Sequence, residues 1–402
     1  MFTGKGGVGK TSVAAATALR SAELGYRTIV LSTDSAHSLS DSYEVSLGNE
    51  PRLITENLWG QETELAKTME VHWGTIQAYI SALLAWRGMD EITAEEIAVF
   101  PGMEELANLL YILHYQNEGQ YDVTIMDCAP TADTLRLLSF PEMMHWWMTK
   151  MFPIGRKVAS MIYPLARTLV NMPLPDNEVF KSIEKLYSEL EKIHTLLTDA
   201  ETTSVRLVVN PEKMVIKEAQ RTFTYLNLYG YPTDLIVCNR IIPEKVADNY
   251  FQTWKENQKK YHQLIEEGFS PLPIFDVPLM EQEIVGIPML RRMAKALYGD
   301  NDPTTIFFRG QVQEIQKEDR YYVLTLALPF TSKEKISLLQ SGDELTIQVA
   351  NFRRNIILPH ALLGLPVTEA KMDGSKLKIT FQQQETKDKY RKTQKARRSE
   401  HE

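Results

Sequence analysis

Cysteine and long uncharged segments are both scarce in this sequence. Its 402 residues include two cysteines, Cys128 and Cys238, and neither has a Cys or His neighbour at metal-ligand spacing. This argues against a disulfide framework, a zinc ribbon and a redox CxxC pair. The longest stretch without Asp, Glu, Lys or Arg, from Val71 to Trp86, is too short and too polar to span a bilayer. We therefore expect no transmembrane segment.

Positive charge is not in excess either, because the formal net charge is -8. Such a chain is a poor nonspecific binder of nucleic acid, so no nucleic-acid partner is expected. The apolar start is limited to Met1 and Phe2, which is unlike a secretory signal, so we expect a reducing, cytoplasmic location. The length and the 44% hydrophobic content are typical of two or three globular domains.

Short apolar runs predict strands in the first 300 residues. The run at 28–32 follows a Gly-rich loop and a helical segment at 12–22, which indicates βα alternation and a parallel sheet. We therefore predict an α/β domain over 1–300, in which helices flank a parallel sheet. A helical subdomain is expected at about 61–120 and 140–200. The other predicted strands lie at 121–127, 205–209, 235–239 and 275–278.

Alternating β patterns begin near residue 303 and continue to about 382. Turn signals at Gly342-Asp343 and Asp373-Gly374 separate them. They predict a separate all-β sandwich over 303–382. Residues 383–402 are polar and largely basic without an apolar stripe, so a disordered tail is favoured over a specific binding element.

Residues Gly4 to Thr11, GKGGVGKT, fit the phosphate-binding pattern G-x-x-x-x-G-K-[ST]. Glycines let backbone N–H groups surround phosphate oxygens, and the helix that follows directs its positive dipole end at them. In such a P-loop Lys10 bridges the β- and γ-phosphates, and Thr11 ligates Mg²⁺. The alternative is a Gly-rich turn without a ligand. The predicted nucleotide-binding residues here are Gly4, Lys5, Gly6, Gly7, Val8, Gly9, Lys10, Thr11 and Ser12.

Two features of this loop are unusual. Only Met1 to Thr3 precede it, so we expect a very short first strand, and a natural start a few residues earlier stays open. Lys5 is a second lysine inside the loop. It either faces solvent or acts on phosphate across a dimer interface, as an arginine finger does.

Two acidic residues follow predicted strands, at the edge where ligands bind in open α/β sheets. Asp34 follows the strand at 28–32 and is predicted to orient an attacking water, the alternative being a helix N-cap. Asp127 ends the strand at 121–127 and is predicted to hold Mg²⁺ through water. Pro130 and Thr131 are predicted to form a switch that senses the γ-phosphate. The predicted catalytic residues are Asp34, Lys5 and Lys10.

These motifs resemble those of the arsenite-pump ATPases and of their eukaryotic relatives that target tail-anchored membrane proteins, which are deviant Walker A ATPases. The loop from Gly4 to Thr11 is identical to the family's, and residues 32–43 and 127–141 resemble its two switches. The resemblance covers about residues 1–300. It implies an ATPase that binds ATP, ADP and Mg²⁺ as a homodimer, with Lys5 reaching the partner's phosphates. It also implies that Asn239 contacts the adenine base and that Pro278 lies in the loop closing over it.

Some positions depart from the family pattern. Ser35 replaces a proline, and Ala132 and Asp133 replace Gly-His, which leaves the coupling of the switches open. No cysteine occurs in 241–268, so the zinc clamp of the eukaryotic members is not expected, and no zinc cofactor is predicted. The two cysteines fall in nucleotide motifs, so a three-thiol arsenite site is not available.

The all-β region resembles the α-crystallin domain of small heat-shock proteins at 328–330, 345–347, 356–359 and 370–379. A different region, from 140 to 172, is rich in large, flexible apolar side chains, which suit capture of apolar segments. An ordinary helix–helix core is the alternative. The family's use of this region as a hydrophobic groove favours client binding, and the predicted client-binding residues are Met143, Met144, Trp147, Met148, Met151 and Met161.

The preferred hypothesis is a homodimeric ATPase whose nucleotide cycle opens and closes a groove for a hydrophobic protein segment, in a chaperone or targeting role. One alternative is a MinD-like or ParA-like regulatory ATPase without a hydrophobic client. Others are a nucleotide-locked structural module and, less favoured, an arsenite-pump subunit.

Overall fold

The computed structural model describes most of the chain. The described residues are 1–32, 38–62, 65–90, 93, 103–128, 148, 175, 177–310, 313–327, 336–349, 352–373 and 376–382. The chain divides into two compact units, 1–310 and 311–402. None of the described helices has the length and apolar composition needed to cross a membrane.

The first unit is built on one eight-stranded sheet with the order β3-β4-β2-β5-β1-β6-β7-β8. All neighbouring pairs are parallel except β3 and β4 at one edge. Its central strands are rich in buried aliphatic side chains, as a sheet covered on both faces requires. The strands are β1 (Phe2–Thr3), β2 (Thr28–Ser32), β3 (Arg52–Thr55), β4 (Leu58–Glu62), β5 (Val123–Asp127), β6 (Val205–Val209), β7 (Thr233–Ile241) and β8 (Ile274–Pro278).

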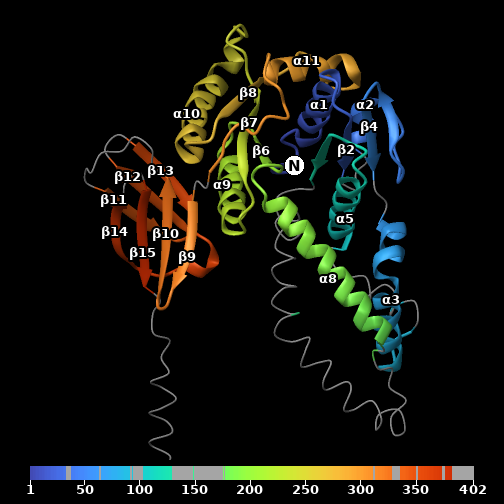
Figure 1. Cartoon of the computed structure of the whole chain (residues 1–402). Coiled ribbons are helices and arrows are strands. Elements are labelled where there is room, and N and C mark those ends of the chain that lie inside the picture. Colours follow the sequence, from blue (N-terminus) through green and yellow to red (C-terminus); the bar gives the residue numbers. More distant parts are fainter. Residues whose placement is uncertain are drawn as a thin grey trace, which may run out of the picture. The chain divides into compact units, whose positions relative to one another are not determined.

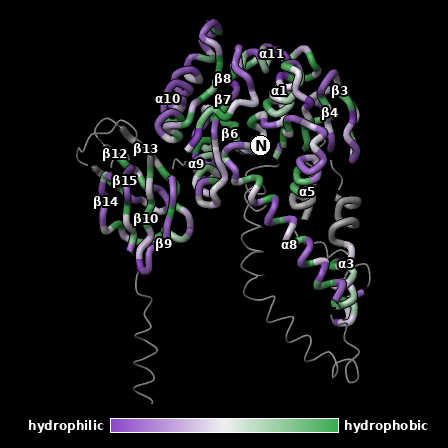
Figure 2. Tube along the Cα trace, viewed as in Figure 1, coloured by the Kyte–Doolittle hydropathy of each residue, from purple (hydrophilic) through white to green (hydrophobic). Residues whose placement is uncertain are grey.

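Helices pack around this sheet (Figure 1). Helix α1 (Lys10–Glu23) contacts β2, β5, the short α2 (Ser38–Tyr43) and α11 (Gly286–Tyr298). Helix α9 (Lys213–Leu228) contacts β6 and β7 and lies against α10 (Gln252–Phe269), which follows the 3-10 turn η1 (Asn249–Phe251). Figure 2 shows hydrophobic residues along β6 and β7 and mostly hydrophilic ones along α10.

Three further helices contact one another. They are α3 (Leu65–Trp86), α5 (Met103–Glu118) and α8 (Asn177–Thr198), and α8 contacts both of the others. One stripe of α8 is buried at helical spacing, which explains why this otherwise polar helix docks. The buried residues of the stripe are Val179, Leu186, Leu190, Ile193 and Leu197.

A buried ion pair fastens the end of the first unit. The guanidinium of Arg206 in β6 donates to Asp234 at 3.2 Å and to the carbonyls of Pro303 and Thr305 at 2.8 and 3.0 Å. The Asp234 carboxylate also accepts from the Phe307 backbone N–H at 3.2 Å. Both charged side chains are at most 5% exposed, so each depends on the other for solvation.

The second unit contains two antiparallel sheets. One has the order β14-β15-β10-β9 and the other the order β11-β12-β13. Their alternating inward residues form one aliphatic core, which includes Leu324 and Leu326 from the first sheet and Leu345 and Ile347 from the second. The elements are β9 (Gln313–Glu318), β10 (Tyr321–Ala327), β11 (Ile336–Ser341), β12 (Glu344–Val349), β13 (Phe352–Ile357), η2 (His360–Leu362), β14 (Val367–Asp373) and β15 (Lys376–Gln382).

The predicted α/β fold with a C-terminal all-β region is confirmed. Each strand expected in 1–300 corresponds to a strand of the sheet, although β7 extends from Thr233 to Ile241 rather than over 235–239 alone. Strands β3 and β4 were not expected. Strand β4 ends at Glu62, so the sheet extends slightly into the stretch that was predicted to be helical from about residue 61.

Candidate nucleotide-binding site

The loop from Gly4 to Gly9 joins the central strand β1 to helix α1. Strand β1 lies between β5 and β6, so the loop emerges from the middle of the sheet at the carboxyl ends of its parallel strands. The first helical amide with a bond to the loop is Val13 N–H, which donates to the Gly9 carbonyl at 3.0 Å. The N–H groups of Lys10, Thr11 and Ser12, at the start of α1, are left for a ligand, because a helix cannot pair its own first amides.

Gly9 has no room for a side chain. Its φ is +95°, and a Cβ atom built there would lie 2.4 Å from Asn239 Nδ2. The same Asn239 amide donates to the Val8 carbonyl at 2.8 Å, while its Oδ1 accepts from Arg240 N–H at 2.9 Å. The carboxamide at the end of β7 therefore holds the turn of the loop in place.

A cleft of about 740 Å³ opens over this loop. Its floor is the loop and the start of α1, one side is α2, and the other side is formed by the ends of β7 and β8 with the segment that follows. The lining residues are Gly6, Gly7, Gly9, Lys10, Thr11, Ser12, Ser38, Asp41, Ser42, Asn239, Arg240, Pro278, Leu279, Met280, Gln282, Glu283, Ile284 and Val285.

Several predicted nucleotide-binding residues thus meet in one cleft from segments about 230 residues apart. Lys10 is 6% exposed, while Lys5, Thr11 and Ser12 are half-buried. Three of the predicted residues, Gly4, Lys5 and Val8, do not line the cleft, and of these Gly4 and Val8 are buried in the loop. Asn239 lines the cleft and also holds the loop through its hydrogen bond to the Val8 carbonyl.

Asp127 is buried at the carboxyl end of β5, beside Phe2 of β1 and Ser32 of β2 in the sheet register. Carboxylate and hydroxyl oxygens are the donors that Mg²⁺ prefers, so Asp127 and Thr11 fit the ion expected there. Burial raises the pKa of the neighbouring Cys128 thiol to about 12, so this thiol stays protonated. Asp34, Pro130 and Thr131 lie outside the described residues.

Sequence reasoning missed Glu62. This residue, 3% exposed at the end of β4, accepts hydrogen bonds from the Leu39 and Ser40 amides at 3.0 and 2.9 Å and from the Ser40 hydroxyl at 2.5 Å. It therefore anchors the start of α2, directly after the segment that contains Asp34. Twenty-two residues separate Glu62 from Ser40, and no local sequence pattern signals such a bond.

Replacing Gly9 by alanine is expected to weaken the fold and nucleotide binding together. A side chain at positive φ costs about 1–2 kcal/mol, and here the Cβ also displaces Asn239. Calorimetric titration with ATP and Mg²⁺ should show a large loss of affinity. Gly6→Ala is the matched control for stability, because nothing lies within 4 Å of a Cβ at Gly6. Equal denaturation midpoints for the two variants would contradict this role of Gly9.

Comparison with known proteins places this site in a family. Residues 1–299 match the family profile described as anion-transporting ATPase, and residues 319–381 match the HSP20-like domain found in ArsA. The chain belongs to the ArsA family of ATPases, and it is an ATP-hydrolysing enzyme with a C-terminal HSP20-like domain.

Relatives extend over nearly the whole chain. A provisionally named arsenical pump-driving ATPase of Aquifex aeolicus is 40% identical, with 94% of this chain and 98% of the relative covered. ATPase GET3C of Arabidopsis thaliana is 28% identical over 74% of this chain and 81% of its own. ATPase ASNA1 homolog 1 of Paramecium tetraurelia is 28% identical over 73% and 90% respectively.

Proposed function

We propose that the chain works as a cytoplasmic homodimer whose ATP cycle opens and closes an apolar helical surface for a hydrophobic protein segment. The observation that carries this proposal is α3. It has no charged residue from Val71 to Trp86, yet its C-terminal half is not fully buried. Ile80, Leu83 and Leu84 are half-buried and Trp86 is 40% exposed.

A long uncharged stretch of helix with incompletely buried apolar side chains is unusual on a monomer surface and is typical of binding grooves. Helix α3 packs against α5 and α8 on part of its circumference, with Ile76 buried. Among the residues that the structure describes, the remaining apolar part of α3 is only partly covered, and we propose that a partner binds there. Of the client-binding residues expected from sequence, Met148 is described as helical and half-buried. The others, Met143, Met144, Trp147, Met151 and Met161, lie outside the described residues.

The proposed chemistry is phosphoryl transfer to water. Lys10 neutralises charge on the β- and γ-phosphates, Thr11 and Asp127 hold Mg²⁺, and Asp34 orients the water. Bound magnesium supplies further neutralisation of charge on the phosphates. Lys5 acts on the partner's nucleotide, while Pro130 and Thr131 report the γ-phosphate to the helices. Asn239 and Pro278 flank the base.

Arsenical-pump driving is the second candidate, because it stands in the name of the Aquifex relative. The chemistry of the chain gives it less support. The chain has two cysteines, and both are buried. One chain therefore offers no cluster of three thiolates for a soft metalloid ion.

The test is binding of a fluorescent, uncharged helical peptide of about 20 leucine and alanine residues, the length of a membrane span, with Mg²⁺–ATP and with Mg²⁺–ADP. The affinity for the peptide should differ between the two nucleotide states. In the state that binds the peptide more tightly, Trp86→Asp should lower the affinity about tenfold or more, because the burial of one large side chain contributes about 1.5–3 kcal/mol. Trp254→Asp is the matched control, since Trp254 is also exposed on a helix.

Sedimentation of the same samples should show a dimer with ATP. The client role would be overturned if the peptide affinity were the same with ATP and with ADP and were unchanged in both tryptophan variants. Retention of ATP hydrolysis without any peptide binding would favour a regulatory ATPase instead.

A further inference from the structure

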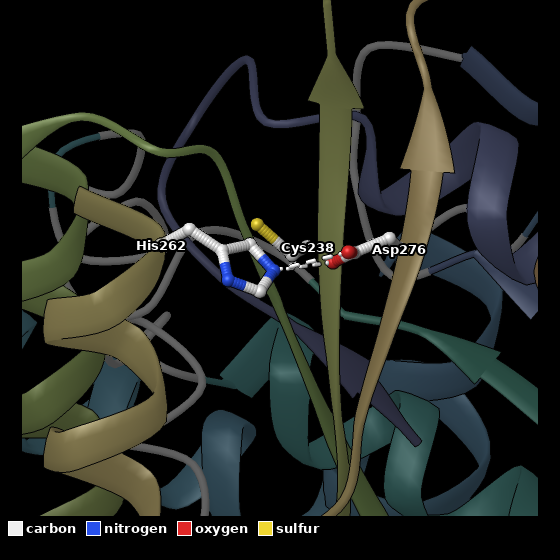
Figure 3. A group of neighbouring side chains, drawn as sticks. All are labelled: Cys238, His262 and Asp276. Carbon is white, nitrogen blue, oxygen red and sulfur yellow. Dashed lines mark hydrogen bonds and ion pairs between the residues drawn. The ribbon is translucent and has the colours of Figure 1, made fainter. Parts of the chain in front are cut away.

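Three potential metal ligands meet on a part of the sheet that the ATPase site does not use. Cys238 in β7 and Asp276 in β8 are direct partners in the parallel register, so their side chains project from the same face. His262 of α10 covers that face, and its ring points toward the Asp276 carboxylate with the Cys238 side chain close by (Figure 3). The thiol, imidazole and carboxylate ligand atoms all lie within 4.8 Å of one another.

The imidazole is oriented by two carboxylates. Its Nε2 lies 2.9 and 3.0 Å from the two Asp276 oxygens, and its Nδ1 lies 3.3 Å from Glu266 Oε1, one turn further along α10. Metal-binding histidines commonly present one nitrogen to the ion and the other to a carboxylate that fixes the ring. Here Glu266 is the carboxylate that fixes the ring through Nδ1. The other nitrogen, Nε2, is directed toward Asp276 and can bind an ion together with Cys238.

A nucleophilic Cys-His-Asp triad does not fit this arrangement. A triad needs the imidazole between the thiol and the carboxylate, with one nitrogen for each. Both nitrogens of His262 instead face carboxylates. The Cys238 side chain is also buried, so a substrate does not reach its thiol. A His–Asp ion pair alone would account for the contact between α10 and β8, but it does not involve the Cys238 sulfur, which lies within 4.8 Å of the other two ligand atoms.

We propose that Cys238, His262 and Asp276 bind one zinc ion, with solvent as the fourth ligand and Glu266 orienting the imidazole. A mixed sulfur, nitrogen and oxygen set suits Zn²⁺, and hard cations such as Mg²⁺ avoid it. Zinc–ligand distances of about 2.0–2.3 Å set ligand-to-ligand edges of about 3.3–3.7 Å in a tetrahedron.

The cluster needs only small movements to reach that geometry. The His262–Asp276 edge of 2.9 Å must widen slightly, and the ligands up to 4.8 Å apart must close by about 1 Å. His262 and Asp276 are 24% and 47% exposed, so an ion and a solvent ligand can enter from outside. Cys238 directly precedes Asn239, so an ion here would stiffen the strand end that holds the P-loop.

The experiment uses the full-length, untagged protein, freed of metal with a chelator and kept without nucleotide. Titration with Co²⁺ is expected to give one equivalent of tetrahedral absorption with a thiolate-to-metal charge-transfer band, and Zn²⁺ should displace it. His262→Gln and Asp276→Asn should each weaken cobalt binding at least tenfold. Glu266→Gln should also weaken it, by about 10–100-fold at most, because Glu266 only orients the imidazole. Cys238→Ser should abolish the charge-transfer band.

Two matched controls isolate the site. Cys128→Ser retains the only thiol that the proposal uses, and His114→Gln removes a histidine that also pairs with a glutamate one turn away, Glu118. Both should bind cobalt as the wild type does. Absence of a charge-transfer band in the wild type, or unchanged binding by His262→Gln and Asp276→Asn, overturns the proposal. Those two surface variants decide the matter even if Cys238→Ser does not fold.

Discussion

Replacing Lys10 by methionine is expected to lower kcat for ATP hydrolysis about 10²–10³-fold, the usual effect of removing one group that stabilises transition-state charge. Lys10 lies at the first position of α1, lines the cleft and is only 6% exposed. A cation held in so little water is well placed to neutralise phosphate oxygens. The measurement is steady-state phosphate release at saturating Mg²⁺–ATP.

The control for this variant is Lys213→Met, which removes an exposed lysine at the start of another helix, α9. Both variants should keep the circular dichroism of the wild type, and Lys213→Met should also keep its kcat. A Lys10→Met enzyme that turns over ATP at the wild-type rate would remove Lys10 from the reaction.

Replacing Arg206 by methionine is expected to lower the free energy of unfolding by about 3–5 kcal/mol, because it leaves the buried Asp234 carboxylate without its counter-charge. The carbonyls of Pro303 and Thr305 lose their donor at the same time. Guanidinium denaturation followed by tryptophan fluorescence measures the loss. Limited proteolysis should also cut the segment after residue 302 sooner.

Two further variants separate burial from charge. Arg27→Met breaks the Arg27–Asp122 pair, whose side chains are 49% and 40% exposed, and should have a much smaller effect because water screens this pair. The double change Arg206→Met with Asp234→Leu should recover part of the stability, because no buried charge remains unpaired. Equal losses for Arg206→Met and Arg27→Met would contradict the argument from burial.

The sequence predicted the fold well, and it predicted a loop followed by a helix at the start of the chain, because these signals are local. GKGGVGKT is contiguous, and short apolar β-branched runs such as 28–32 and 205–209 are typical of buried parallel strands. The two-residue β1 was also expected from the short segment before the loop. In each case a few adjacent residues carry the whole physical argument.

The parts that sequence reasoning missed depend on distant neighbours. Strand β3 is a four-residue, largely exposed edge strand that has no apolar periodicity to detect. Glu62 acquires its role from amides that only folding brings to it. The zinc cluster is the clearest case, since Cys238, His262 and Asp276 are separated by 24 and 14 residues on three elements. A search for close metal-ligand spacing passes over such a set.

The topology of the first unit has one mechanical consequence. Ser32 is the sheet partner of both Glu62 and Asp127, so the strands β4, β2 and β5 end level with one another at the phosphate edge. The chain continues from Glu62 to α3, which begins at Leu65. Helix α3 therefore starts close to the row of strand ends beside the loop between β1 and α1. A displacement of about an ångström at Glu62 would be magnified along the 22-residue length of α3.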